Sequence, residues 1–185
     1  MHLAIAGGVR ALQFVISLTI LAIAADFIRH QVLGDAPVTT RYSTFTGGFG
    51  MLVCGVGAVA LFVTSIPALV PIALDGLMGL FFLAGGIAWA VGLRGTGNCN
   101  DPVGMLGNQL LNRGSVSTDN DVYYGIIEPD DDELAVFNKL RGACQRGTAE
   151  EVLQFIAFGA AISLIGIGYS TWKRGTSMGS RHPAV

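Results

Sequence analysis

Charged residues are scarce in this sequence of 185 residues. Asp, Glu, Lys and Arg together make up 13% of the chain, about half of the fraction in an ordinary soluble domain. A soluble protein of this length needs charge to cover its surface, so the shortage argues against water as the main solvent. The net charge of −2 and the lack of a dense Lys/Arg cluster also argue against nucleic-acid binding.

Histidine and cysteine are scarce as well, with three of each. His2, His30 and His182 are scattered over the N-terminus, the first loop and the tail, and their spacing fits neither a metal site nor a catalytic triad. A membrane enzyme usually shows His, Asp, Glu or Ser clustered at the ends of its spans. The sequence therefore predicts a protein that is not an enzyme and that holds no metal or other cofactor.

Hydrophobic residues, in contrast, make up 51% of the chain and come in long blocks. A helix needs about 20 mostly apolar residues to cross a bilayer. The chain supplies four such stretches, at 5–27, 45–66, 69–93 and 152–172. The sequence therefore predicts an all-α bundle of four antiparallel transmembrane helices.

The segments between these stretches differ in kind. The first stretch begins almost at Met1, and its length favours an uncleaved anchor over a signal peptide. Pro67 lies between the second and third stretches and predicts a tight hairpin there. The segment 94–151 is the one sizeable soluble part, with an acidic run and a short amphipathic helix expected at 130–140. We expect one membrane domain over 1–175 and a cytosolic tail over 176–185.

The positive charges give a modest indication of topology. Four spans place both termini on the same side, and Lys173, Arg174 and Arg181 follow the last span as a cytoplasmic flank would. Arg94, Arg141 and Arg146 lie near span ends on the opposite side, which weakens this preference.

The cysteines favour the same topology. Cys99 follows the third stretch and Cys144 precedes the fourth by a similar distance. If the loop is extracytoplasmic, a disulfide between them closes a loop of about 45 residues and stabilises the fold by about 4 kcal/mol in the chain-entropy model. The alternative is two reduced surface thiols. Cys54 lies inside the second stretch, where we expect a small packing residue.

Several short segments resemble a known family, the fungal four-span MARVEL-domain proteins of the non-classical export and eisosome-associated branch. The resemblance covers the third stretch and its exit best. The matching segments are 73–75, 81–86 (Phe-Phe-Leu-Ala-Gly-Gly), 90–94, 99–100 and 144–145.

The resemblance implies a left-handed four-helix bundle with cytosolic termini and an extracellular connection between the third and fourth helices. It also implies a role in lateral plasma-membrane domains, vesicle trafficking or membrane apposition, with membrane lipids, such as a sphingolipid or sterol, and membrane proteins as partners. This chain departs from the family in having a longer and more acidic loop and a tail without a strong basic cluster.

Asp75 is the most suggestive single residue because a carboxylate inside a span often marks an ion or proton path. It lies about one turn after Pro71, so the free amides at a helix start offer a structural explanation that needs no transport role. Arg10 is the candidate partner of Asp75 if both lie towards the cytosolic face.

Small residues recur where helices would meet, as expected in lipid, where close backbone approach drives association. Gly50, Cys54 and Ala58 are spaced four apart on the second stretch and share one side of it. This face packs either within one bundle or between copies in a homo-oligomer. The other helix-packing candidates are Gly79, Gly85, Gly86, Gly159 and Ser163.

These observations favour a membrane-organising protein that acts through lipid and protein contacts, without chemistry of its own. The main alternative is a small transporter or channel subunit that uses Asp75. A lipid-modifying enzyme is the least favoured class.

Overall fold

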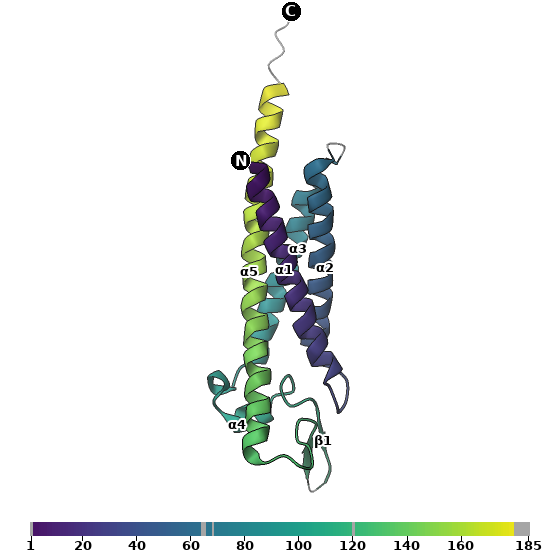
Figure 1. The fold of residues 1–185 in the computed structure, drawn as a ribbon, viewed down its shortest axis with the longest axis vertical. Helices are drawn as coiled ribbons and strands as arrows, with labels where there is room; N and C mark the ends of the chain where they lie inside the picture. Colours follow the sequence, from purple (N-terminus) through teal and green to yellow (C-terminus); the bar gives the residue numbers. More distant parts are fainter. Residues whose placement is uncertain (1, 64–65, 68, 120, 180–185) are drawn as a thin grey trace, which may run out of the picture.

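A computed structural model describes residues 2–63, 66–67, 69–119 and 121–179. Four long helices dominate it, and a small subdomain lies between the third and the last of them (Figure 1). The helices and strands are α1 His2–Arg29, α2 Val38–Phe62, α3 Leu69–Gly92, the short 3-10 helix η1 Gly97–Cys99, α4 Pro102–Leu106, β1 Ser115–Ser117, β2 Val122–Tyr124 and α5 Glu133–Gly179.

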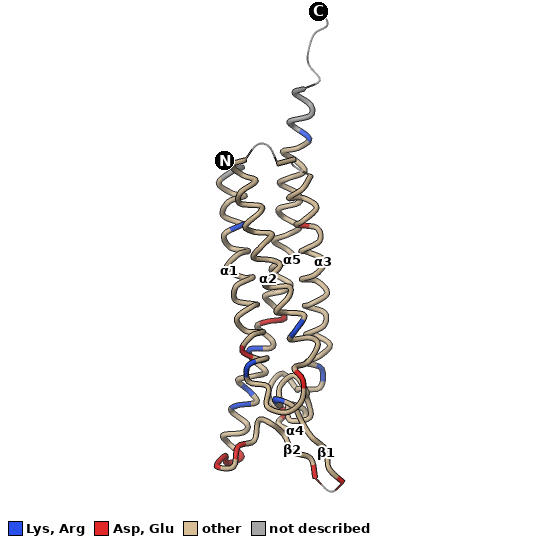
Figure 2. The backbone as a smooth tube through the Cα atoms, turned by 90° about the vertical axis from the view of Figure 1, so that its right-hand side faces the viewer, with Lys and Arg blue, Asp and Glu red and all other residues tan. Residues whose placement is uncertain are grey.

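The prediction of four membrane-spanning helices is confirmed, since α1, α2, α3 and α5 are each long and apolar enough to cross a bilayer. The start of α1 and the end of α5 lie at one end of the bundle, and the α3–α5 connection lies at the other (Figure 1). We call these the terminus end and the loop end. Charged residues, blue and red in Figure 2, are sparse along the helices and gather towards the loop end.

α1 and α2 form a close pair because glycines remove side chains from their contact. A Cβ atom added at Gly47 would lie 2.7 Å from the backbone nitrogen of Leu21, so the two backbones themselves touch. A Cβ atom at Gly50 would lie 2.5 Å from Oγ of Ser17. Residue numbers fall along α1 as they rise along α2, so these two helices run in opposite directions.

α3 and α5 form a second close pair on the same principle. Gly79 faces Ala161, with 3.3 Å between an added Cβ atom and the Cβ atom of the alanine, and Gly86 faces the ring of Phe155. The two helix pairs then meet along an apolar layer in the middle of the bundle. The buried members of that layer are Ile16, Ile20, Val53, Met78, Phe82, Ala157 and Ala161.

The last helix corrects the sequence analysis. We expected a short helix at 130–140, a loop up to residue 151 and a span at 152–172, but α5 is one helix of 47 residues. Its start is capped by Asp132, whose carboxylate accepts a hydrogen bond from the amide of Ala135 at 2.7 Å. No proline interrupts it, and Gly147 lets it pass close to the ring of Trp89.

Other boundaries shift by a few residues. α2 begins at Val38 instead of residue 45 because Pro37, which cannot continue a helix from its N-terminal side, sets its start. α5 continues to Gly179, past residue 176, from which we expect the tail. Residues 180–185, which include Arg181 and His182 of the sequence analysis, lie outside the described residues.

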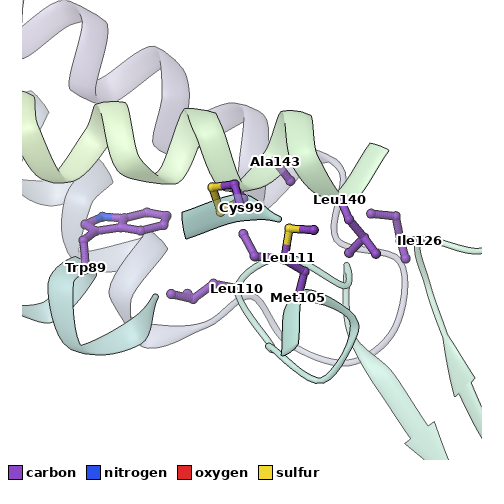
Figure 3. Close-up of a cluster of buried hydrophobic side chains, with 9 residues drawn as sticks. Trp89, Cys99, Met105, Leu110, Leu111, Ile126, Leu140 and Ala143 are labelled. Atoms are coloured by element: carbon purple, nitrogen blue, oxygen red, sulfur yellow. A yellow bond between two sulfur atoms is a disulfide. The ribbon is translucent and has the colours of Figure 1, made fainter. Parts of the chain in front are cut away.

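The connection between α3 and α5 is a small folded subdomain that includes a two-stranded sheet, which the all-α prediction missed. Strand β1 pairs with β2, with Val116 opposite Tyr123. Beneath the start of α5, side chains from the connection pack on Leu140 and Ala143 (Figure 3). The fully buried members from the connection itself include Met105, Leu111 and Ile126.

Candidate functional site

Arg10 of α1 and Asp75 of α3 join the two helix pairs near the terminus end. Both terminal nitrogens of the guanidinium donate to the carboxylate, at 2.5 and 2.7 Å. The side chains are only 8% and 2% exposed. A paired fork of this kind is among the strongest hydrogen-bonding arrangements in proteins. Asp75 therefore does not rely on the amides of a helix start, because it lies beyond the first turn of α3 and binds Arg10.

A cavity of about 350 Å³ lies beside this ion pair and is lined by all four long helices. Gly57 provides the room for Arg10, since a Cβ atom there would lie 2.3 Å from the guanidinium carbon. The walls are otherwise mostly apolar. They include Ala6, Leu61, Ile66, Ile72, Leu164, Ile167 and Thr171. The two pairs are thus less tightly packed at the terminus end than in the middle.

Towards the loop end, Ser43 of α2 joins the pairs through hydrogen bonds alone. Its hydroxyl oxygen accepts from Nε1 of Trp89 at 2.7 Å and from Nε2 of Gln154 at 2.8 Å. Gln154 fits because α3 has Gly85 opposite it, where a Cβ atom would lie 1.8 Å from the amide oxygen. Beside Ser43 and Gln154 lies the carboxyl group of Glu150, which is fully buried.

The sequence analysis missed Glu150 as a site residue because it placed this residue in the soluble loop. A signal was present in the periodicity of the segment. Small, polar and apolar residues recur every three or four positions and all are buried in α5: Ala143, Gly147, Glu150, Gln154, Ala157, Ala161 and Leu164. That stripe is typical of one helix face that continues through the predicted loop boundary.

The small residues of α2 pack within the bundle. Gly50 is buried against Ser17 and Phe82, and the thiol of Cys54 lies 3.8 Å from the amide oxygen of Gln13. Ala58 is partly exposed. The suggestion that this face joins neighbouring copies is therefore corrected, because its two best-placed residues are covered by α1 and α3.

Gly159 and Ser163 of α5 lie elsewhere. No other side chain or helix comes within 4 Å of a Cβ atom added at Gly159. Ser163 is exposed, and its hydroxyl donates to the carbonyl oxygen of Gly159 at 2.9 Å. These two residues face away from the bundle.

The predicted disulfide between Cys99 and Cys144 is present, with Cα atoms 5.6 Å apart. It ties the exit of α3 to the first half of α5. Nearby, Arg146 pairs with Asp26 of α1 and lies over the ring of Phe27. The loop end is thus fastened by a covalent bond, an ion pair and the apolar core of the subdomain.

The acidic run, residues 128–133, is held by Lys139, which pairs with both Glu128 and Asp131. Asp131 accepts two hydrogen bonds from Nζ of Lys139, at 2.8 and 2.9 Å. These bonds and a backbone amide lower the pKa of Asp131 below its usual range. Across the described residues, no group of three or more His, Cys, Asp or Glu side chains is arranged to hold a metal ion.

Four apolar helices that turn their polar side chains inward define a multi-pass membrane protein. More specifically, residues 3–165 match the model of the MARVEL family, the membrane-associating domain, and the chain belongs to that family. No curated protein and no solved structure matches the chain.

Proposed function

We propose that this protein organises membranes, in lateral plasma-membrane domains or in vesicle trafficking, through contacts with lipids and membrane proteins and without catalysis. Membership of a family of membrane-associating domains supports this proposal. The observation that carries it is the outward surface of the helices, which is apolar while the polar side chains named above are buried. Exposed residues on it include Leu12, Val15, Leu18, Leu52, Val59, Leu80, Ile87 and Ile162.

The lateral contact that such a role needs is assigned to the outer face of α5. Gly159, Ser163 and Gly166 lie along one side of this helix, and nothing lies within 4 Å of an added Cβ atom at either glycine. A second helix, from another copy or from another membrane protein, can therefore approach the backbone closely there.

Two bulky substitutions test this assignment, one on the outer face of α5 and one on α3 where that helix packs against α5. Gly159→Leu should disperse membrane clusters of the tagged protein and leave its thermal stability in detergent unchanged, because the residue contacts nothing within the bundle. Gly79→Leu is the matched control and should instead lower thermal stability, because Ala161 lies against it. Unchanged clustering by Gly159→Leu would contradict the lateral contact.

The topology that we propose has cytosolic termini and an extracytoplasmic α3–α5 connection. The disulfide at the loop end supports it, since disulfides persist in oxidising compartments. Protease added to intact cells should cut the connection, whereas cleavage only after the membrane is opened would reverse the orientation. Imaging of the tagged protein in the native cell tests whether it lies in the plasma membrane and in eisosome-like domains. Co-purification tests whether a sphingolipid, a sterol or a membrane protein accompanies it.

A second candidate function, that of a small transporter or channel subunit, is favoured by the cavity beside Arg10 and Asp75. Proteoliposome flux that is present in the wild type and lost in a folded Asp75→Asn variant would favour it. The paired guanidinium gives Asp75 a structural role, so we place this candidate second.

A further inference from the structure

We propose that Glu150 is a proton-binding site, at which the carboxyl group holds a proton between the two helix pairs and donates a hydrogen bond to Gln154. The site is independent of the membrane-organising role. It is formed by Ser43 of α2, Trp89 of α3, and Glu150 and Gln154 of α5, all of which are buried.

Charge balance is the first argument. Glu150 is 0% exposed, and a buried carboxylate is costly unless a cation pairs with it. Among the ion pairs of the described residues, none includes Glu150. Arg146, one turn before Glu150 on α5, is paired with Asp26 of α1. The facing groups are the hydroxyl of Ser43 on α2, from the other pair, and the indole of Trp89 on α3, and neither carries a charge.

The hydrogen bonds give a second argument. Both lone pairs of the Ser43 hydroxyl are occupied by N–H groups of Trp89 and Gln154, so its own proton must be donated to another acceptor. Three buried oxygens have no partner of hydrogen-bond geometry among the described residues: both carboxyl oxygens of Glu150 and the amide oxygen of Gln154. Glu150 and Gln154 lie one turn apart on α5, and the donors that face the carboxyl group of Glu150 are the Ser43 hydroxyl and the amide N–H group of Gln154. Neither can supply a proton to the amide oxygen of Gln154 while Ser43 donates to Glu150.

A proton on Glu150 completes this network. Ser43 then donates to one oxygen of Glu150, and the other oxygen, as O–H, donates to the amide oxygen of Gln154. With a carboxylate in its place, the amide oxygen of Gln154 would have no donor among the described residues. A bound metal cation fits less well, because hard cations need about six oxygen ligands and this cluster offers fewer.

The glycine at position 85 indicates that the network is a built feature. A Cβ atom there would lie 1.8 Å from the amide oxygen of Gln154, so α3 has no side chain at the point where Gln154 reaches Ser43. Arg10 at the terminus end has the same arrangement with Gly57. Gln154 and Arg10 therefore each lie against a glycine on the other helix of their own pair.

Infrared spectroscopy of the full chain in lipid nanodiscs at neutral pH tests the proposal. The difference spectrum of the wild type against Glu150→Gln should contain the carbonyl band of a protonated carboxylic acid. Glu151→Gln, a change at the partly exposed next residue, should give carboxylate bands only. Carboxylate bands for Glu150, or their appearance when sodium or potassium salts are added, would overturn the proposal, the latter in favour of a cation site.

Thermal unfolding supplies a second readout. Glu150→Gln should unfold at the wild-type temperature because an amide keeps one donor and one acceptor, whereas Glu150→Ala should unfold at a lower temperature. Equal losses from both variants would contradict a neutral group. If Glu150→Gln does not fold, Ser43→Ala replaces it, and the protonated-acid band should move to higher frequency when that donor is lost. If the protonated-acid band is absent, or if Ser43→Ala leaves its frequency unchanged, the proposal is overturned.

Discussion

The two ends of the contact between the helix pairs both bury polar groups, but they do so with different chemistry. At the terminus end, Arg10 and Asp75 are opposite charges that neutralise each other beside a cavity. Towards the loop end, Ser43, Trp89, Gln154 and Glu150 form a cluster without a cation, next to a subdomain closed by a disulfide. One end is thus held by a buried ion pair, and the other by buried hydrogen bonds, a half-exposed ion pair and covalent closure.

The largest effect is expected from breaking the charge pair. Arg10→Leu or Asp75→Leu alone should lower the free energy of unfolding by about 3–5 kcal/mol because the remaining charge is buried without a partner. Asp75→Asn should also be costly, since it leaves Arg10 unneutralised. Unfolding in detergent measures these changes, and the double variant Arg10→Leu/Asp75→Leu should recover most of the loss. A double variant as unstable as the single ones would show that the pair is not the source of the effect.

Removing the disulfide should have a comparable but localised effect. Cys99→Ser with Cys144→Ser opens a loop of 45 residues, which the chain-entropy model values at about 4 kcal/mol. Hydrogen exchange should increase in the α3–α5 connection while α1 and α2 remain protected. Treatment of the wild type with reductant is the control and should give the same pattern. Equal loss of protection at the terminus end would mean that the two ends are not independent.

A smaller effect is expected from Ser43→Ala, which removes the acceptor shared by Trp89 and Gln154. Leaving buried N–H groups unsatisfied costs about 1–3 kcal/mol. Thr44→Ala is the matched control, because the Thr44 hydroxyl bonds only to its own helix, at the carbonyl oxygen of Thr40, and it should change stability by less than about 0.5 kcal/mol. Equal losses of stability for the two variants would show that the hydrogen-bond cluster does not hold this end of the bundle.

The smallest effect concerns pH. The pKa of Asp131 is lowered in the folded protein by the hydrogen bonds from Lys139, so the unfolded chain takes up a proton first as the pH falls. The contact therefore contributes fully above about pH 4, the usual Asp value, and is lost as the pH falls through the lower folded value. Chemical shifts of the Asp131 carboxyl should show this titration, and Lys139→Gln should return it towards the usual value.

The sequence predicted the parts of the fold that depend on hydropathy. Long apolar runs identify α1, α2 and α3 because lipid imposes length and composition on a helix. Hydropathy did not identify the first half of α5 as part of the last helix, because this half lies beside the subdomain and has an ordinary mixture of polar and apolar residues. The strands β1 and β2 are three residues each, too short for a recognisable alternation.

The site required information that one sequence does not contain. Arg10 and Asp75 were named as candidates, but they lie 65 positions apart, and their contact depends on how the two helix pairs dock. The inward face of α2 was equally undetermined, since it has glycines on both sides: Gly50 and Gly57 face the bundle, whereas an added Cβ atom at Gly48 or Gly55 meets nothing within 4 Å.

The unbroken course of α5 has a mechanical consequence. A helix of 47 residues is about 70 Å long, more than twice the thickness of the hydrocarbon layer, and its first turns belong to the subdomain while its last turns extend past the other helices (Figure 1). Because the disulfide fastens the subdomain to this helix, one continuous helix joins the subdomain to the terminus end of the bundle. If the subdomain and α5 tilted as one rigid body, the far end of α5 would move in the opposite direction, without any rearrangement of the helix in between.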